Sequence, residues 1–379
     1  MNSSFKIAIG GDLIPSGANI KLYEEGDAEK IFSQEVVDIF VNADFSIVNL
    51  EGALTDSDTK QRKIGPNIKA SLATVQGIRR LGVKAAALAN NHITDYGDKG
   101  YADTISILAE NGITYLGAGP DKLRIKTHVS VQTPGGGNLC VYNVSETFFN
   151  VPDDHHAGVN VYDEWTVLNE IKKLKTAHDY LIVIYHGGAE NFQYPTPQTR
   201  KRFHRMAECG ADLITAQHTH CIGCEEFYGD SYLLYGQGNF SFPLMHKGIN
   251  REGIVLEVVF DGKAIIKKHR IEMQDDDCLV YSENQNWDDV SKRSAKINDK
   301  EFIVNEYKKN ELAQKRFVSR YLHSYKGVSA KLLHKMLPHK LWVKWAKTYS
   351  SYQILCNKYA IESDRVREDL FYCWSSMED

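Results

Sequence analysis

Short apolar runs alternate with polar turns and longer amphipathic segments along the first 270 residues of the chain. The runs are rich in β-branched residues and have the length of buried strands; they read FKIAIGGDLI, DFSIVNLEG, VKAAALANNH, ITYLGAG, NLCVYNVSE, YLIVIYHGG, ADLITAQHTH, YLLYGQGNF and GIVLEVVF. Between them, the spacing of apolar residues predicts helices over 29–41, 70–81, 99–111, 163–176 and 197–209. This alternation predicts an α/β protein with a largely parallel sheet or sheets. The last run differs, because Asp261-Gly262 follows it and predicts a hairpin.

The pattern changes near residue 275, where three aspartates open a polar stretch without apolar periodicity. We therefore divide the chain into a main domain over 1–273, a polar connector over 274–297 and a helical extension over 298–379. Within the extension, 308–347 is basic and aromatic. This stretch could contact an anionic membrane surface, an acidic polymer or a polymer synthase, or it could be an amphipathic helical pair with a solvated basic face.

Composition and charge narrow the class of protein. The chain has 379 residues, of which 42% are hydrophobic and 25% charged, as is typical of a folded globular protein. Residues 301–379 carry a net charge of +5 and the rest −9, which together give −4. A negatively charged body makes nucleic acid an improbable partner. Scattered cysteines and the lack of a secretory signal favour a cytoplasmic location, with peripheral membrane contact as one alternative.

Polar side chains collect where five of the predicted strands end; they are Asp12, Glu51, Asn90-Asn91-His92, His186, and His218 with His220. Alone, each has an ordinary explanation as a turn, a helix cap or a hydrogen-bonded core residue. Together they are harder to explain, because buried polar groups are costly unless they are paired or bind metal. Ligands bind at the carboxyl ends of strands in open α/β sheets, and imidazole with carboxylate suits Zn, Mn or Fe. His218 and His220 are alternate residues, which point the same way in an extended segment.

Six motifs resemble the bacterial CapA or PGA_cap capsule-synthesis family, which is related to the calcineurin-like metallophosphoesterases. They are GGDLIPSG, NLEGALT, LANNHITDYG, IYHGGAE, AQHTH and YGQGNFSF; they follow the family order and cover residues 5 to about 260. The resemblance implies an α/β fold of the metallophosphoesterase-like kind, a four-layer αββα sandwich. It also implies a centre of two divalent metal ions, Mn, Zn or Fe, at the strand ends.

The resemblance also implies roles for single residues. The metal ligands would be Asp12, Glu51, Asn91, His186, His218 and His220, with Glu51 bridging the two ions. His92 would lie beside the leaving group, and Asp95 would orient it. Glu190, Asn49 and Asn239 would support the ligands from behind.

The sequence departs from the family pattern at three places. Asp12 is followed by Leu13 and Ile14, where metallophosphoesterases have Asp-x-His, and Glu51 replaces their second aspartate. Gly187 stands where the family commonly has tryptophan. We therefore expect the first metal position to be poor in ligands and the pocket to lack this aromatic wall.

The resemblance leaves two alternative functions for the protein. The first is a metal-dependent hydrolase or transferase of the CapA type, with a metal-activated water or hydroxyl as nucleophile. Its substrate would be a cell-envelope polymer or its precursor, in capsule or poly-γ-glutamate biosynthesis. The alternative is a non-catalytic assembly factor for polymer synthesis, in which a degenerate metal site is structural.

Cys221-x-x-Cys224 directly follows the histidines and needs its own interpretation. A zinc ribbon needs a second pair, and a redox pair needs the start of a helix. We therefore interpret the two cysteines as ordinary, partly buried residues.

Overall fold

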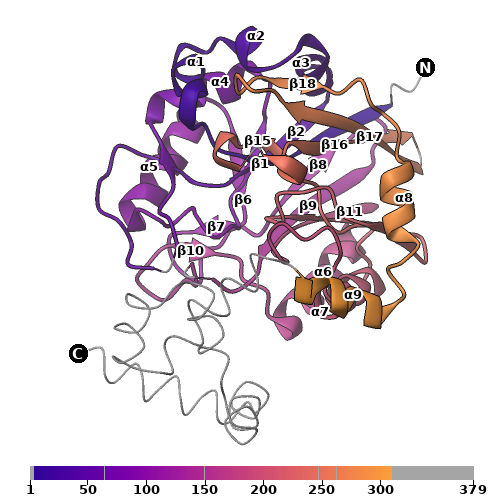
Figure 1. Cartoon of the computed structure of the whole chain (residues 1–379). Coiled ribbons are helices and arrows are strands. Elements are labelled where there is room, and N and C mark those ends of the chain that lie inside the picture. Colours follow the sequence, from indigo (N-terminus) through magenta and orange to yellow (C-terminus); the bar gives the residue numbers. More distant parts are fainter. Residues whose placement is uncertain (1–3, 64, 149, 246, 262, 310–379) are drawn as a thin grey trace, which may run out of the picture. The chain divides into compact units, whose positions relative to one another are not determined.

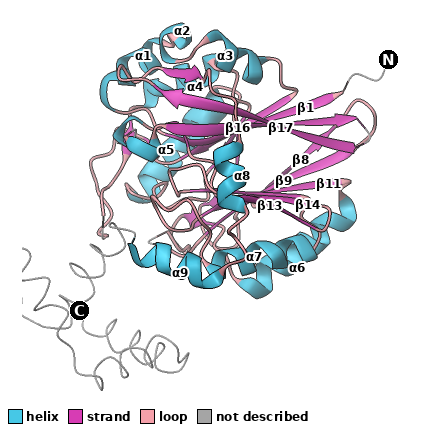
Figure 2. Cartoon of the chain, turned by 45° about the vertical axis from the view of Figure 1, so that its right-hand side comes forward, coloured by secondary structure: helices cyan, strands magenta, loops and turns pink. Residues whose placement is uncertain are grey.

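Two large β-sheets lie between outer layers of helices in the computed structural model (Figures 1 and 2). The structure describes residues 4–309 except 64, 149, 246 and 262. The helical extension predicted beyond residue 309, and nearly all of the basic stretch 308–347, therefore lie outside the described residues. One compact unit extends as far as Tyr307.

The larger sheet has eight strands and a parallel centre. Its order is β18 (Leu279–Tyr281), β17 (Lys263–Met273), β16 (Glu252–Asp261), β1 (Phe5–Leu13), β2 (Phe45–Leu50), β5 (Ala85–Ala87) and β6 (Thr114–Leu116), and β15 (Asn239–Ser241) also pairs with β1. Strands β1, β2, β5 and β6 are parallel, whereas β16, β17 and β18 are antiparallel. The predicted hairpin at Asp261 is confirmed, because this residue pairs with Lys263.

The second sheet has six strands and again a parallel centre. Its order is β13 (Glu225–Tyr228), β14 (Ser231–Leu234), β12 (Leu213–Gln217), β11 (Tyr180–His186), β9 (Asn138–Ser145) and β8 (His128–Gln132). Two small sheets pair β3 (Ala53–Leu54) with β4 (Lys69–Ala70) and β7 (Ala118–Gly119) with β10 (Gly158–Val159). The parallel strands of both large sheets end at the edge where the predicted site residues lie.

Helices cover the outer faces of both sheets, which confirms the four-layer αββα arrangement (Figure 2). On the larger sheet lie α1 (Ile20–Glu25), α2 (Ala28–Ile31), α3 (Gln34–Val41), α4 (Val75–Arg80) and α5 (Gly97–Glu110), and on the six-stranded sheet lie α6 (Glu164–Ala177) and α7 (Pro197–Glu208). Helices α8 (Asp288–Ser294) and α9 (Lys300–Lys309) follow the last strand. Among the described residues, no helix is both long and apolar enough to cross a membrane.

Strand residues alternate between two apolar cores, as the two-residue period of a strand requires. Ile7 and Ile9 of β1 pack between the two sheets, whereas Ala8 faces the outer helices. In β11, Ile182 and Ile184 likewise face the inter-sheet core. Because both faces are buried, the middle of each of these strands is apolar, and Asp12 and His186 stand at or near the carboxyl ends.

The predicted helix over 29–41 is wrong as a single element. It is divided into α2 and α3, because Phe32 forms a parallel bridge with Leu279 and the amide of Ser33 donates to the Leu279 carbonyl at 2.9 Å. The first part of the helix predicted over 70–81 is also wrong, since Ala70 belongs to β4 and a 3-10 turn precedes α4.

Residues 274–297, interpreted from the sequence as a connector, contain β18 and α8. Strand β18 pairs with β17, and Met273 lies opposite Leu279. Helix α9 then contacts the main body, where the Phe302 ring packs edge-on to Tyr194 at 5.4 Å between centroids. These segments therefore belong to the same compact unit as the sheets.

Candidate metal centre

Five buried side chains meet where the carboxyl ends of the two sheets face each other. Asp12 lies near the end of β1, and Glu51 directly follows β2. His186 is the last residue of β11, and His218 and His220 follow β12. Asp12, Glu51 and His186 are fully buried, and His218 and His220 are only 3% and 5% exposed. The packing of the two sheets thus brings together residues that are up to 208 positions apart in the sequence.

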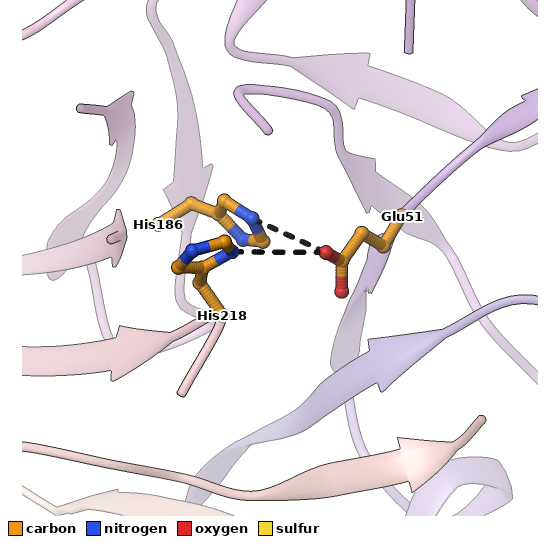
Figure 3. Close-up of side chains that lie close together, drawn as sticks. All are labelled: Glu51, His186 and His218. Atoms are coloured by element: carbon orange, nitrogen blue, oxygen red, sulfur yellow. Dashed lines mark ion pairs between the residues drawn. The ribbon is translucent and has the colours of Figure 1, made fainter. Parts of the chain in front are cut away.

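The side chains form two groups that share Glu51. Glu51, His186 and His218 make up the first, which we call the His218 group, and Asp12, Glu51 and His220 make up the second, the Asp12 group. In each group the candidate ligand atoms lie within 4.8 Å of one another. Figure 3 shows the imidazoles of the His218 group pointing at the carboxylate, with Glu51 Oε1 at 3.5 Å from His186 Nε2 and 3.9 Å from His218 Nδ1.

The His218 group has the chemistry that a divalent cation needs. Neither carboxylate oxygen of Glu51 has a hydrogen-bond partner among the described residues, although both are buried, and His218 Nδ1 is in the same state. Buried acceptors without partners are rare in folded proteins because each costs free energy. A cation between these atoms would satisfy all three, so the residues fit a metal ion.

Burial sets the charges in the centre. It lowers the pKa of His186 to about 4, so this imidazole is neutral and keeps a lone pair for a ligand at neutral pH. Burial and the neighbouring Glu51 raise the pKa of Asp12 to about 7. Burial lowers the pKa of His218, but the neighbouring Glu51 and Glu190 carboxylates raise it above its usual value, so each group contains one ligand that takes up a proton more readily than usual.

The backbone that carries His218 and His220 is strained. The φ angles of His218 and His220 are +84° and +57°, a region that residues with a Cβ rarely adopt. Strand β12 ends at Gln217, so the expectation of an extended segment is wrong at these positions. Both histidines still reach the centre, but through a tight turn. Strain of this kind is often found at functional sites.

Asn49 and Asn239 each contact candidate ligands. Asn49 Nδ2 lies 2.8 Å from Asp12 Oδ1 and 3.2 Å from His186 Nδ1. Asn239 donates to two backbone carbonyls through Nδ2, and its Oδ1 lies 2.8 Å from His220 Nδ1. This oxygen can only accept, so the proton of neutral His220 is on Nδ1 and Nε2 keeps its lone pair.

The two asparagines after β5 form different contacts. Asn90 stabilises the loop, because its Oδ1 accepts from the amides of His92 and Ile93, both at 3.0 Å. Asn91 Oδ1 reaches the centre and lies 2.8 Å from His186 Nε2. The structure thus brings Asn91 to the His218 group, next to a candidate ligand.

His92 and Asp95 form a pair beside the centre. His92 Nδ1 lies 2.7 Å from Asp95 Oδ2, and His92 is 7% exposed. Lys63, which sequence reasoning missed, forms an ion pair with the other oxygen of Asp95. A lysine in a polar loop is usually solvated, so the sequence carries no signal for its burial.

Phe148 is a second residue that sequence reasoning missed. Its ring lies 5.0 Å from the His218 ring and 6.5 Å from the His186 ring, between centroids. A side chain at position 187 would clash with Glu146, because a Cβ on Gly187 would lie 2.5 Å from Cγ of that residue. The aromatic contact therefore comes from the loop after β9 instead. Glu190 is the remaining predicted residue, and its Oε1 lies 3.7 Å from His218 Nε2.

Cys221 and Cys224 are buried and form no disulfide. Burial raises the pKa of both thiols to about 12, which keeps them protonated and unreactive at neutral pH. Neither belongs to the groups that could hold a metal ion among the described residues. They are therefore ordinary buried cysteines.

The sandwich and its buried cluster of histidines and carboxylates define the class: an α/β protein with a candidate metal centre at the carboxyl ends of its strands. A family model described as "Bacterial capsule synthesis protein PGA_cap" matches residues 6–244, more than half of the chain. The chain belongs to this family.

Two relatives and one solved structure illustrate the similarity. The chain is 27% identical to "Capsule biosynthesis protein CapA" of Bacillus anthracis over 64% of its length, and 26% identical to "PGA biosynthesis protein CapA" of Bacillus subtilis (strain 168) over 61%. The matches span 60% and 62% of these relatives' lengths. A hypothetical protein from Thermus thermophilus superposes with a TM-score of 0.47 at 16% identity, covering 71% of this chain and 99% of that one.

Proposed function

We propose that the protein is a metal-dependent hydrolase or transferase that acts on a cell-envelope polymer or its precursor. Family membership and the names of the relatives connect it with the synthesis of capsule and of PGA, which we take to be poly-γ-glutamate. The observation that carries the proposal is the buried Glu51 carboxylate, whose oxygens have no hydrogen-bond partner among the described residues and face two imidazoles.

The ligands of the proposed centre come from both groups. Glu51, His186, His218 and Asn91 would hold one ion, and Asp12, Glu51 and His220 a second, with Mn, Zn or Fe as the candidates. Bound divalent ions would supply an activated water and stabilise the charge on the attacking and leaving oxygens. Asn49 and Asn239 would hold Asp12 and His220 in place through their hydrogen bonds.

His92 would assist the departure of the leaving group. Its Nδ1 is occupied by the Asp95 carboxylate at 2.7 Å, so Nε2 is the nitrogen that can donate a proton or a hydrogen bond. Asp95 is also held by the ammonium of Lys63 and by the amide of Ile68, the latter at 2.7 Å, and therefore orients the imidazole rigidly.

The polymer and the synthase are the proposed partners. Residues 308–347 would contact an anionic membrane surface or the synthase through their basic side chains, with the protein in the cytoplasm. This part of the proposal rests on sequence, because nearly all of the stretch lies outside the described residues.

The test combines elemental analysis with an assay on an aryl phosphate ester and on amide-linked glutamate oligomers. We expect metal in the purified protein, and we expect both metal and turnover to be lost in the double variant His218→Ala/His220→Ala. His269→Ala is the matched control, because this histidine also contacts a carboxylate, Glu257 at 3.0 Å, but lies on β17 outside the centre. A double variant that keeps metal and turnover at the wild-type level contradicts the proposal.

One observation favours the assembly factor as the second candidate. Both oxygens of Asp12 already accept hydrogen bonds, from Asn49 Nδ2 and from the amide of His218. If these bonds keep a second ion out, the His218 group alone would bind metal and serve as a structural element. One tightly held ion per chain, with no turnover of any polymer or ester, is the result that this candidate requires.

A further inference from the structure

Lys63 is a buried lysine beside the candidate centre. It lies in the loop 55–68 between β3 and β4, yet its side chain is only 3% exposed, whereas the neighbouring Arg62 is exposed. A buried ammonium is costly unless it is paired, so Lys63 must form contacts that offset the cost of its burial. Lys63 itself has no role so far in metal binding, proton transfer or support of a ligand.

The ammonium group contacts two elements of the site at once. Nζ forms an ion pair with Asp95 and donates to the Asn91 carbonyl at 3.1 Å. It also lies 3.2 Å from His92 Nδ1. One atom therefore connects the backbone of a candidate metal ligand with the carboxylate that orients the neighbouring imidazole.

The rest of the loop holds both the backbone carbonyl and the carboxylate of Asp95. The amide of Gln61 donates to the Asp95 carbonyl at 2.8 Å, and the amide of Ile68 donates to Asp95 Oδ2 at 2.7 Å. Asn67 Nδ2 adds a third bond, to the Asp95 carbonyl at 2.9 Å. Since both Asp95 and Lys63 are enclosed, an incoming substrate cannot reach the ammonium, which excludes direct binding of a substrate anion.

We propose that Lys63 is a positioning residue that fixes Asn91 and His92 relative to each other. The proton donor His92 is thereby held in a fixed position beside the candidate ligand Asn91. This inference rests on the proposed function. A lysine suits the task because its ammonium carries three donors in different directions on a flexible stem, whereas the planar fork of arginine would not reach both acceptors from the same place.

The experiment compares Lys63→Met and Lys63→Arg with Lys84→Met. Lys84 is a matched control, because its Nζ also bonds backbone carbonyls, those of Ala43 and Asp44 at 2.7 and 2.9 Å, but at the opposite end of β5. The readouts are the imidazole nitrogen signals of His92 by NMR, Mn²⁺ affinity by calorimetry, and kcat and KM with any substrate that the wild type turns over.

Lys63→Met should shift the His92 signals and leave those of His204 and His269 in place. Mn²⁺ affinity should fall by about 10–100-fold, as for other residues that act through a ligand. The fall in turnover should be in kcat, with KM nearly unchanged, because Lys63 does not touch substrate. Lys63→Arg should show the same defects in weaker form, and Lys84→Met should match the wild type.

Two results separate this inference from the proposed function. If Lys63→Met matches Lys84→Met in the His92 signals and in Mn²⁺ affinity, the role of Lys63 is overturned while the metal centre stands. If the wild type binds no Mn²⁺ and turns nothing over, the proposed function fails, and the His92 signals alone decide about Lys63.

Lys63→Met leaves Asp95 as a buried carboxylate without its ion pair, so it could fail to fold. Lys63→Met/Asp95→Asn removes both charges together and serves as the second variant. It should fold and still bind Mn²⁺ more weakly than the Asp95→Asn single variant. Equal Mn²⁺ affinity in these two variants overturns the inference.

Discussion

The His218 group and the Asp12 group share Glu51 but differ in the hydrogen bonds that their candidate ligand atoms form. In the His218 group, both Glu51 oxygens and His218 Nδ1 are buried without a hydrogen-bond partner among the described residues. In the Asp12 group, Asp12 Oδ1 accepts from Asn49 and Oδ2 from the amide of His218, both within 2.9 Å. His220 Nδ1 is likewise bound, to Asn239 at 2.8 Å.

The difference indicates that the two groups differ in their affinity for a cation. Buried acceptors without a hydrogen bond favour a cation strongly, because the cation removes a cost that folding has already incurred. Acceptors that are already paired gain less. Asp12 also holds the amide of His218, so the Asp12 group helps to keep that residue in its strained conformation at φ +84°. We therefore expect the His218 group to bind the tighter ion.

Glu51→Gln should have the largest effect, because it removes the carboxylate that both groups share. In the wild type, Mn²⁺ at roughly 100 times its dissociation constant should stabilise the fold by about 2.7 kcal/mol. This stabilisation should disappear in the variant, together with bound metal in elemental analysis. Thermal unfolding with Mn²⁺ or with EDTA measures it.

The control for this change is Asp58→Asn, in which the altered side chain is 97% exposed and remote from the ligand atoms. It should keep the wild-type shift. A Glu51→Gln variant that is still stabilised by Mn²⁺ would mean that the two groups do not depend on a common ligand.

Single histidine variants should then separate the groups. His218→Ala removes a ligand from the tighter site, and we expect Mn²⁺ affinity to fall by more than about 100-fold, beyond the range seen for supporting residues. His220→Ala should keep about one ion per chain, because the His218 group is left intact. Calorimetry with Mn²⁺ gives both affinity and stoichiometry.

His204→Ala is the control for both variants, since this histidine contacts Glu226 at 2.8 Å and stacks on Tyr228 away from the centre. Equal losses in His218→Ala and His220→Ala would show that the unpaired atoms of the His218 group give it no advantage.

Most of the fold could be predicted because its signals are local. The apolar runs of β1 and β11 are long and β-branched, and helices α5, α6 and α7 begin and end within two residues of their predicted bounds. The division between α2 and α3 could not be predicted, because Leu279 causes it from a distant part of the sequence. The periodicity of apolar residues in a helix contains no information about a β-bridge to a residue far away in the sequence.

The candidate site could be predicted where a residue type is unusual for its position. Asn91 and His186 stand at strand ends where such residues need a reason, and the structure brings both to one place. Lys63 and Phe148 gave no signal, because lysine in a loop and phenylalanine near a strand are common. Their importance depends on which way the side chain turns, and only the packed structure decides this.

Both groups should lose affinity for a cation as the pH falls. The pKa of Asp12 is raised to about 7 by burial and by Glu51, so below pH 7 a cation in the Asp12 group must displace a proton. In the His218 group, the pKa of His186 is lowered to about 4, so this ligand needs no proton release above pH 5. Burial lowers the pKa of His218, but the Glu51 and Glu190 carboxylates raise it above its usual value, so His218 must release a proton to bind a cation at acidic pH. From pH 7 to pH 6, affinity in the Asp12 group should fall by about fivefold, because an acid with a pKa of about 7 is about half ionised at pH 7 and about one tenth ionised at pH 6.

Mn²⁺ titrations at pH 8 and pH 6 check this expectation by their stoichiometry at a fixed cation concentration. Two ions should bind at pH 8, and the weaker one should be lost first at pH 6. If the ion that depends on His218 is lost first, the comparison between the two groups fails.

Phe148→Leu should have the smallest effect. The ring is half-buried and packs against His218 at 5.0 Å, but it has no atom that could bind a cation. Aromatic contacts of this kind contribute about 0.5–1.5 kcal/mol beyond burial, which corresponds to a change of about two- to tenfold. We expect a rise in KM of this size, with Mn²⁺ stoichiometry unchanged.

Phe227→Leu is the control, since Phe227 is 74% exposed on the edge strand β13, away from both groups. A rise in KM alone would identify Phe148 as a wall of the substrate pocket, in place of a side chain that Gly187 cannot supply. A fall in Mn²⁺ affinity would instead mean that the ring holds His218 in its strained conformation. In that case the His218 group, like the Asp12 group, would depend on neighbours to keep its ligands in place.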